Sequence, residues 1–158
     1  MFTTGHYLGF LGVAIAVVFS GFGSALGVAK AGQALAGVCA EKPDRFSKCL
    51  LLELLPATQG LYGFIIGFLI LLRMGVLGGL AELSVEQGIG FLISGIPVGL
   101  VGLVSAIYQG KVAAAGIVMV GKRPEMLGRA MTSTAIVEMY AIFSLIISFF
   151  LCFMGVIQ

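Results

Sequence analysis

Residues 7–40 of the chain read YLGFLGVAIAVVFSGFGSALGVAKAGQALAGVCA, and residues 41–45 read EKPDR. Lys30 is the only charged residue of the longer run. A transmembrane helix needs about 20 largely apolar residues, and this run exceeds that length. No basic residue precedes Lys30, so the run lacks the positively charged start of a signal peptide. We therefore expect it to form the first membrane helix of the mature protein.

The composition of the whole chain agrees with a membrane protein. Of its 158 residues, 59% are hydrophobic and 10% are charged, with a mean hydropathy of +1.14. Soluble domains average about 45–50% apolar and about 25% charged residues. The net charge is only +2, which gives no support for nucleic-acid binding. The sequence predicts an integral membrane protein in contact with lipid, with no room for a separate soluble domain.

The apolar residues fall into four segments, which predict an all-α protein with four transmembrane helices. They span residues 7–40, 50–76, 88–121 and 126–157, and residues 78–82 (GGLAE) break the chain in the middle. The run EKPD at 41–44 recurs as KRPE at 122–125, each time opening the second helix of a hairpin. We therefore expect two tandem-repeated helical hairpins, residues 1–80 and 81–158, with the carboxylate described below in the second.

The charges near the turns predict how the chain is oriented in the membrane. Basic residues mark both hairpin loops: Lys42, Arg45, Lys48, Lys122, Arg123 and Arg129. The middle connection carries Glu82 and Glu86, with only Arg73 nearby. Cytoplasmic loops carry an excess of Lys and Arg. We expect both hairpin loops on the cytoplasmic side and both termini, with the middle connection, on the other side.

Small residues recur at every fourth position of the first and third segments. They are Gly12, Ala16, Ser20 and Ser24, beside Gly23, Gly27 and Ala31, and then Gly102, Ala106, Gly110 and Ala114. Such stripes allow close helix packing in lipid. They favour helices crowded around a central axis, with the Phe-rich second and fourth helices outside. The three cysteines are interpreted as packing residues, and His6 as an ordinary terminal residue.

Glu138 is the most informative single residue, because its neighbours on both sides are apolar. An acidic residue at the centre of a membrane helix costs about 2.5–3.5 kcal/mol on insertion scales, so it indicates function. Gln109 lies twelve residues before Gly121, and Glu138 lies twelve residues after Met126. At about 1.5 Å per residue, both are roughly 18 Å from the same turn. We expect the two side chains to lie level with each other.

The second segment contributes further oxygen atoms at a similar depth. Thr58 and Gln59 follow the first loop by a comparable interval. Pro56 removes a helical hydrogen bond and frees a carbonyl oxygen near residues 52–55. Leu55, Gln59 and Tyr62 share one helical face by their i, i+4, i+7 spacing. A backbone oxygen, an amide and a phenol beside a carboxylate indicate an ion site.

These residues resemble the duplicated proteolipid subunit of V-type rotary ATPases, most closely its bacterial sodium-translocating members. The resemblance rests on residues 54–63 (LLPATQGLYG), 109–116 (QGKVAAAG) and 137–142 (VEMYAI). It implies that identical copies of the chain form a homo-oligomeric rotor ring. Because the most similar family members are bacterial, it also implies a location in a bacterial plasma membrane. It further implies a stator membrane subunit with a positive group, and central-stalk subunits at the cytoplasmic loops.

The resemblance also implies a ligand set for Na⁺. Its members are the carboxylate of Glu138, the side chains of Gln59, Gln109 and Thr58, and the carbonyl oxygen of Leu55, with Tyr62 closing the site. Two positions depart from the family pattern. Ala57 stands where glycine is frequent, and Glu53 is a second acid in an apolar segment. Glu53 either reaches toward the cytoplasmic surface or takes part in ion handling.

The number of neutral oxygens favours Na⁺ as the carried ion, with H⁺ as the alternative. A proton needs only Glu138, whereas Na⁺ prefers several hard oxygen ligands. A stand-alone secondary transporter or channel is a further alternative, and it predicts ion flux through the purified chain alone. We expect no catalytic site in this chain, because it has no phosphate-binding Gly-Lys-Ser/Thr loop. Neither the ring size nor the direction of ATP turnover is encoded locally.

Overall fold

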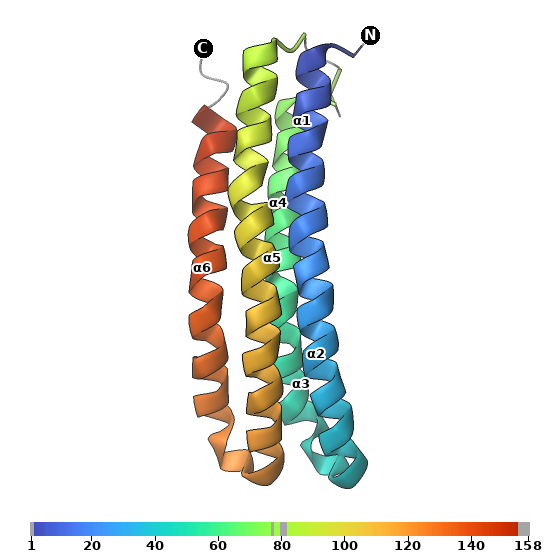
Figure 1. The fold of residues 1–158 in the computed structure, drawn as a ribbon, viewed down its shortest axis with the longest axis vertical. Coiled ribbons are helices and arrows are strands. Elements are labelled where there is room, and N and C mark those ends of the chain that lie inside the picture. Colours follow the sequence, from blue (N-terminus) through green and yellow to red (C-terminus); the bar gives the residue numbers. More distant parts are fainter. Residues whose placement is uncertain (1, 77, 80–81, 155–158) are drawn as a thin grey trace.

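The computed structural model describes residues 2–76, 78–79 and 82–154 and consists of long helices that run side by side (Figure 1). The first span comprises α1 (Thr4–Ala14), the π-helical segment η1 (Ile15–Phe19) and α2 (Ser20–Glu41). The second comprises η2 (Pro43–Arg45), α3 (Phe46–Leu54), η3 (Leu55–Ala57) and α4 (Thr58–Arg73). The third is α5 (Val85–Lys122), and the fourth comprises η4 (Pro124–Met126) and α6 (Leu127–Met154).

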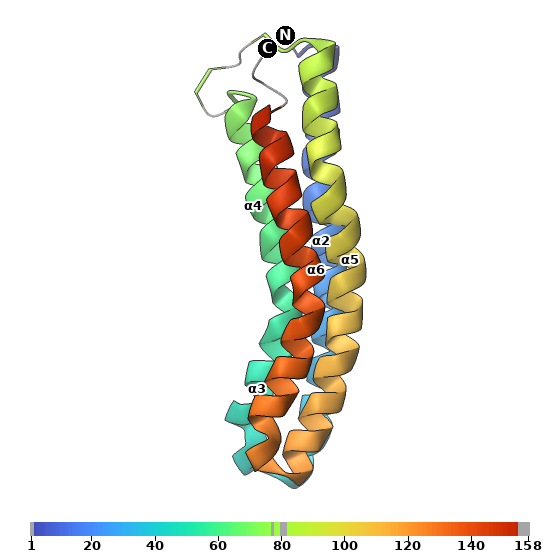
Figure 2. The ribbon, with the colours of Figure 1, turned by 90° about the vertical axis from the view of Figure 1, so that its left-hand side faces the viewer.

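The four spans match the four predicted segments, and each is long and apolar enough to cross a membrane. Figure 1 shows the two short turns at one end of the bundle, and the turned view in Figure 2 shows the start of α5 and the end of α6 at the other end. The end of α4 and the start of α1 also lie at this second end. The predicted fold of two helical hairpins in an integral membrane protein is thereby confirmed.

The predicted boundaries differ most in the second span. Its helical structure begins at Pro43 rather than at residue 50 and ends at Arg73 rather than at residue 76. Asp44, Arg45 and Lys48 lower the hydropathy of residues 43–49. A search for apolar segments therefore does not include these residues, although they are helical. Proline at the start of η2 is compatible with a helical first turn, where no backbone N–H donor is needed. The predicted boundary at 80/81 and the predicted end at 157 lie outside the described residues.

The two hairpins repeat with a fixed spacing. The helices beginning at Thr4 and Val85, and the turns beginning at Pro43 and Pro124, are each 81 positions apart. Helices α1 and α5 also begin in the same way, since Thr3 and Ser84 each form a capping box with the third helical residue. This spacing supports two equivalent units, as the repeated loop sequence predicted.

The interpretation of His6 as an ordinary terminal residue was wrong. His6 is only 2% exposed, and its Nδ1 accepts from the backbone N–H of Thr3 at 3.1 Å. The hydroxyl of Thr3 donates to the carbonyl oxygen of Leu83 at 2.9 Å, just before α5. His6 therefore caps α1 and helps to join the two hairpins. Histidine is not one of the residues that a capping-box motif contains, so no sequence motif indicated this role.

Glycines let the first span lie directly against α5. A methyl group at Gly23 would lie 2.6 Å from the Cα of Leu103, and one at Gly95 would collide with the carbonyl oxygen of Gly12. These are backbone contacts, which cannot be relieved by moving a side chain. The close approach predicted from the small residues is therefore present, and it holds the first span and α5 together.

We expect Gly95→Ala to destabilise the protein, because α1 and α5 would have to move apart. Overpacking of this kind typically costs about 1–3 kcal/mol. Thermal unfolding of the protein in detergent should show a lower midpoint. Gly128→Ala on α6 is the matched control, because a methyl group there meets open space. Equal midpoints for the two variants would show that the contact at Gly95 is not tight.

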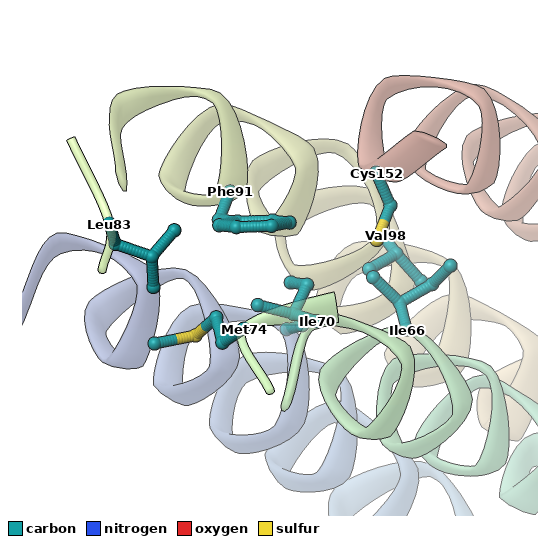
Figure 3. Close-up of a cluster of buried hydrophobic side chains, with 8 residues drawn as sticks. Ile66, Ile70, Met74, Leu83, Phe91, Val98 and Cys152 are labelled. Carbon is teal, nitrogen blue, oxygen red and sulfur yellow. The ribbon is translucent and has the colours of Figure 1, made fainter. Parts of the chain in front are cut away.

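Two apolar clusters fill the bundle on either side of its middle. Figure 3 shows the cluster near the termini, where Phe91, Ile70 and Met74 pack together with Cys152 close to Val98. The cluster near the turns is built around Leu52, Ile117 and Cys49. Cys49 and Cys152 are both fully buried, which confirms that they are packing residues. The polar residues described next lie between these clusters in sequence on each helix.

A lysine also ties the two turns together. Lys42, which follows α2, donates from its Nζ to the carbonyl oxygen of Gly121 at 3.0 Å. Gly121 lies in the last turn of α5, where carbonyl groups lack helical partners and attract positive charge. The turn end of the bundle is thus held as one unit.

Candidate functional site

Two buried glutamines form the centre of a polar layer between α4, α5 and α6. Gln59 of α4 and Gln109 of α5 are both 0% exposed, and Nε2 of Gln59 donates to Oε1 of Gln109 at 2.5 Å. Nε2 of Gln109 donates to the carbonyl oxygen of Thr134 on α6 at 3.2 Å. Thr134 lies one turn before Glu138. The two amides therefore connect three helices at the level of the carboxylate.

Glu138 is half-buried on α6 and faces α4. Its Oε1 accepts from the hydroxyl of Tyr62 at 2.6 Å. Because the uncharged hydroxyl of Tyr62 donates to Oε1, the other carboxylate oxygen, Oε2, is left as an acceptor for a cation. The predicted pairing of Tyr62 with Glu138 is present in the structure.

Pro56 shapes the entry to α4. The structure contains a short 3-10 turn at Leu55–Ala57, between α3 and α4. Thr58, the first residue of α4, donates from its hydroxyl to the carbonyl oxygen of Leu55 at 2.8 Å. The same hydroxyl lies 3.4 Å from Oε1 of Gln59. The Thr58 hydroxyl thus connects the carbonyl of Leu55 with the amide of Gln59, two of the three groups that the residue spacing placed on one helical face.

All six residues proposed from the sequence fall into two adjoining hydrogen-bonded groups. One group contains Leu55, Thr58, Gln59 and Gln109, and the other contains Tyr62 and Glu138. The first group reaches α6 through backbone atoms close to Glu138. The structure therefore brings a single carboxylate together with several neutral oxygens inside an apolar bundle. Such a set of oxygens is chemically suited to a hard cation.

Ser105 of α5 is a member of this network that the sequence did not reveal. It is 6% exposed, accepts from Nε2 of Gln59 at 3.3 Å and donates to the carbonyl oxygen of Val137 at 3.1 Å. One available signal was its position four residues before Gln109, which puts both on one face of the helix. A serine in a membrane helix is too common for that signal to be decisive.

Glu53 lies apart from these two groups. Its Oε1 lies over Gly32 of α2, where an added methyl group would be only 2.7 Å away. The hydrogen bonds that connect the described site residues do not include Glu53. Ala57, the other departure from the family pattern, lies in the 3-10 turn and is exposed. Its small side chain leaves the neighbouring site residues in place.

Comparison with known proteins identifies the family. The family described as the C subunit of ATP synthase matches the chain twice, at residues 11–70 and 92–151. The chain belongs to this ATP synthase C-subunit family. The two matches are again 81 positions apart, so each hairpin corresponds to one copy of the family's domain. The resemblance to a duplicated proteolipid of rotary ATPases is thereby confirmed.

Curated relatives include proteins named for sodium ATPases and for proton ATPases. The chain is 47% identical to V-type sodium ATPase subunit K of Enterococcus hirae over 141 residues, 89% of this chain and 87% of that protein. It is 37% identical to A-type ATP synthase subunit K of Methanocaldococcus jannaschii, covering 91% of this chain and 61% of that protein. It is 31% identical to the V-type proton ATPase 16 kDa proteolipid subunit of Chrysotila carterae, covering 72% of this chain and 70% of that protein.

Proposed function

We propose that this chain is the rotor-ring subunit that carries Na⁺ across the membrane in a V-type ATPase. The observation that carries the proposal is the carboxylate of Glu138, held by Tyr62 one helical turn from the point where a hydrogen-bonded pair of fully buried glutamines binds the backbone of α6. The relative from Enterococcus hirae, named as part of a sodium ATPase, supports the same ion. The relative from Chrysotila carterae is named as part of a proton ATPase, so H⁺ is the alternative.

The assignment of ligands follows from which atoms can accept. Oε2 of Glu138 supplies the negative charge, and Oε1 of Gln59 and of Gln109 supply neutral oxygen. The hydroxyl oxygen of Thr58 and the carbonyl oxygen of Leu55 complete a set of about five oxygens, which suits Na⁺ better than a proton. Tyr62 holds the carboxylate in place by donating to its other oxygen.

Charge neutralisation explains how such a site moves through lipid. An ionised carboxylate alone is costly in an apolar environment, but a bound Na⁺ cancels its charge. A ring with occupied sites can therefore turn through the bilayer. A positive group on the stator would stabilise the empty carboxylate, so that the ion leaves there and another enters from the opposite side.

We place the neighbouring subunit of the ring in a groove between α5 and α6. The groove has a volume of about 540 Å³, and Val104, Tyr108 and Tyr140 contribute to its lining. Within the chain, the opposite side of α5 packs against the first span. Because the hairpins repeat, the first span of a second copy can pack against the groove in turn. Its outward Val18 and Phe22 are exposed and apolar, as such a contact requires.

The sides of the membrane follow from charge. Lys42, Arg45 and Lys48 at one turn and Lys122 and Arg123 at the other favour a cytoplasmic position for both turns. Central-stalk subunits would bind this end of the ring. The termini would then face the outside, and ATP would be made or hydrolysed by other subunits.

The proposal is tested by carbodiimide modification of Glu138 in membranes that contain the assembled ATPase. We expect added NaCl to slow the modification at constant ionic strength, because bound Na⁺ covers the carboxylate. Choline chloride at the same concentration is the control and should give no protection. Modification that responds to pH but not to NaCl would replace Na⁺ with H⁺ as the carried ion.

A further inference from the structure

We propose that Ser105 is a positioning residue that sets the sodium affinity of the site by fixing the amide of Gln59. This inference rests on the proposed sodium function. Ser105 touches neither the carboxylate of Glu138 nor the hydroxyl of Tyr62 in the hydrogen-bond network. It touches Gln59 and the backbone of α6 instead.

The direction of each hydrogen bond follows from two backbone carbonyl groups, which can only accept. The carbonyl of Thr134 requires Gln109 to present Nε2 to it, so Oε1 of Gln109 turns toward Gln59. Gln59 must then present Nε2 to Gln109. Its own Oε1 consequently turns toward the hydroxyl of Thr58. In this orientation the oxygen of Gln59 faces the Thr58 side, and the oxygen of Gln109 keeps its second lone pair for a cation beyond the bond from Gln59.

Ser105 stabilises the same orientation of the Gln59 amide, because its own hydroxyl is held by the second carbonyl group, that of Val137. Its hydroxyl donates to the carbonyl oxygen of Val137, so the remaining lone pairs of its oxygen are directed away from that bond. Nε2 of Gln59 donates to one of them. Both N–H groups of Gln59 are thereby satisfied, one by Gln109 and one by Ser105. A flipped amide would place its oxygen beside the oxygen of Gln109 and leave a donor facing the cation.

Burial makes this orientation matter. Gln59 is fully buried and Ser105 nearly so, and water therefore does not replace a lost partner at low cost. Without the hydroxyl of Ser105, one N–H of Gln59 loses its acceptor. The amide then gains freedom to rotate, and its oxygen spends less time toward the ion. Sodium affinity should fall, whereas protonation of Glu138 should not change.

The experiment measures protection of Glu138 from carbodiimide in membranes with the assembled ATPase, using NaCl as the probe. In Ser105→Ala we expect the NaCl concentration for half-protection to rise about three- to tenfold, the effect of losing one ordinary hydrogen bond. The pH dependence of modification without sodium should match the wild type. An effect through general loss of structure would shift both measurements.

Ser94→Ala is the matched control. Ser94 is also on α5 and 0% exposed, but its hydroxyl donates only to the carbonyl oxygen of Phe91 in its own helix. We expect normal half-protection in this variant. A change in Ser94→Ala as large as that in Ser105→Ala would overturn the proposal, because any buried hydroxyl of α5 would then suffice.

A double variant tests whether Ser105 acts through Gln59. Residues that share one hydrogen bond have non-additive effects. We expect Ser105→Ala to cause little further loss of sodium affinity when Gln59 is already alanine. Additive losses, or unchanged half-protection in Ser105→Ala alone, would overturn this inference while wild-type protection by sodium still supported the proposed function. Absence of sodium protection in the wild type would instead contradict the proposed function itself.

Discussion

Glu138→Gln is expected to abolish ATP-driven uptake of ²²Na⁺ into membrane vesicles that contain the whole ATPase. The glutamine amide is uncharged, so it can neither cancel the charge of Na⁺ nor be attracted to a positive stator group. It can still pair with Tyr62, which now donates to a carboxylate oxygen at 2.6 Å. We therefore expect membrane insertion and ring assembly to be preserved, because burying the neutral amide costs less than burying the carboxylate.

Glu125→Gln provides the control for this prediction. Glu125 is an exposed carboxylate in the short turn η4, outside the polar layer. Its removal changes the net charge of the chain by the same amount and should leave uptake close to the wild-type rate. Ring assembly is checked in both variants by the mass of the detergent-extracted complex. Loss of the ring in Glu138→Gln would show that Glu138 is a structural residue.

Gln109→Ala is expected to weaken sodium binding without preventing protonation of Glu138. The substitution removes one neutral oxygen and leaves Nε2 of Gln59 without its partner at 2.5 Å. Loss of a polar partner for a charged group costs about 1.5–3 kcal/mol. The sodium concentration for half-protection of Glu138 from carbodiimide should therefore rise about ten- to hundredfold. Protons should compete with sodium at higher pH than in the wild type.

Gln33→Ala is the comparison for this second prediction. Gln33 lies on α2 and is exposed, so its amide takes no part in the buried layer. We expect its half-protection value to equal that of the wild type across pH. An unchanged value in Gln109→Ala would contradict our assignment, because Gln109 would then only join helices while the ion was held elsewhere.

The four spans and the hydrogen-bonded polar layer could be predicted because each depends on short-range sequence features. The length of an apolar segment predicts a membrane helix. A single acidic residue such as Glu138 within that segment is costly to bury, so it stands out in the sequence. Helical geometry then relates residues on one helix, as it does for Gln59 and Tyr62. The number of residues between Gln109 and the turn predicted its depth relative to Glu138, because a short turn fixes how the two helices of a hairpin are aligned. The repeat also showed in the sequence, since the turns at Pro43 and Pro124 kept similar residues.

Helical pattern was insufficient where a residue's role depended on a partner from another helix. Residues 43–49 are helical, because the helix extends beyond its apolar part. Their charged side chains kept them out of the predicted apolar segment. His6 became a buried cap only through its contact with Thr3, which in turn binds Leu83 of the other hairpin. A serine such as Ser105 satisfies its hydroxyl within its own helix as readily as across helices, so its type reveals no partner.

The sequence by itself determined the class of fold, the repeat and the position of the carboxylate, since apolar length, duplicated turns and the cost of a buried charge are local properties. Tertiary structure decided which atoms of the site face one another. Direct backbone contact between α1 and α5, as at Gly12 and Gly95, sets the helix separation. That separation lets Ser105 reach both Gln59 and the carbonyl of Val137. Hydrogen bonds require atoms within about 3 Å, a distance that only the packed helices define.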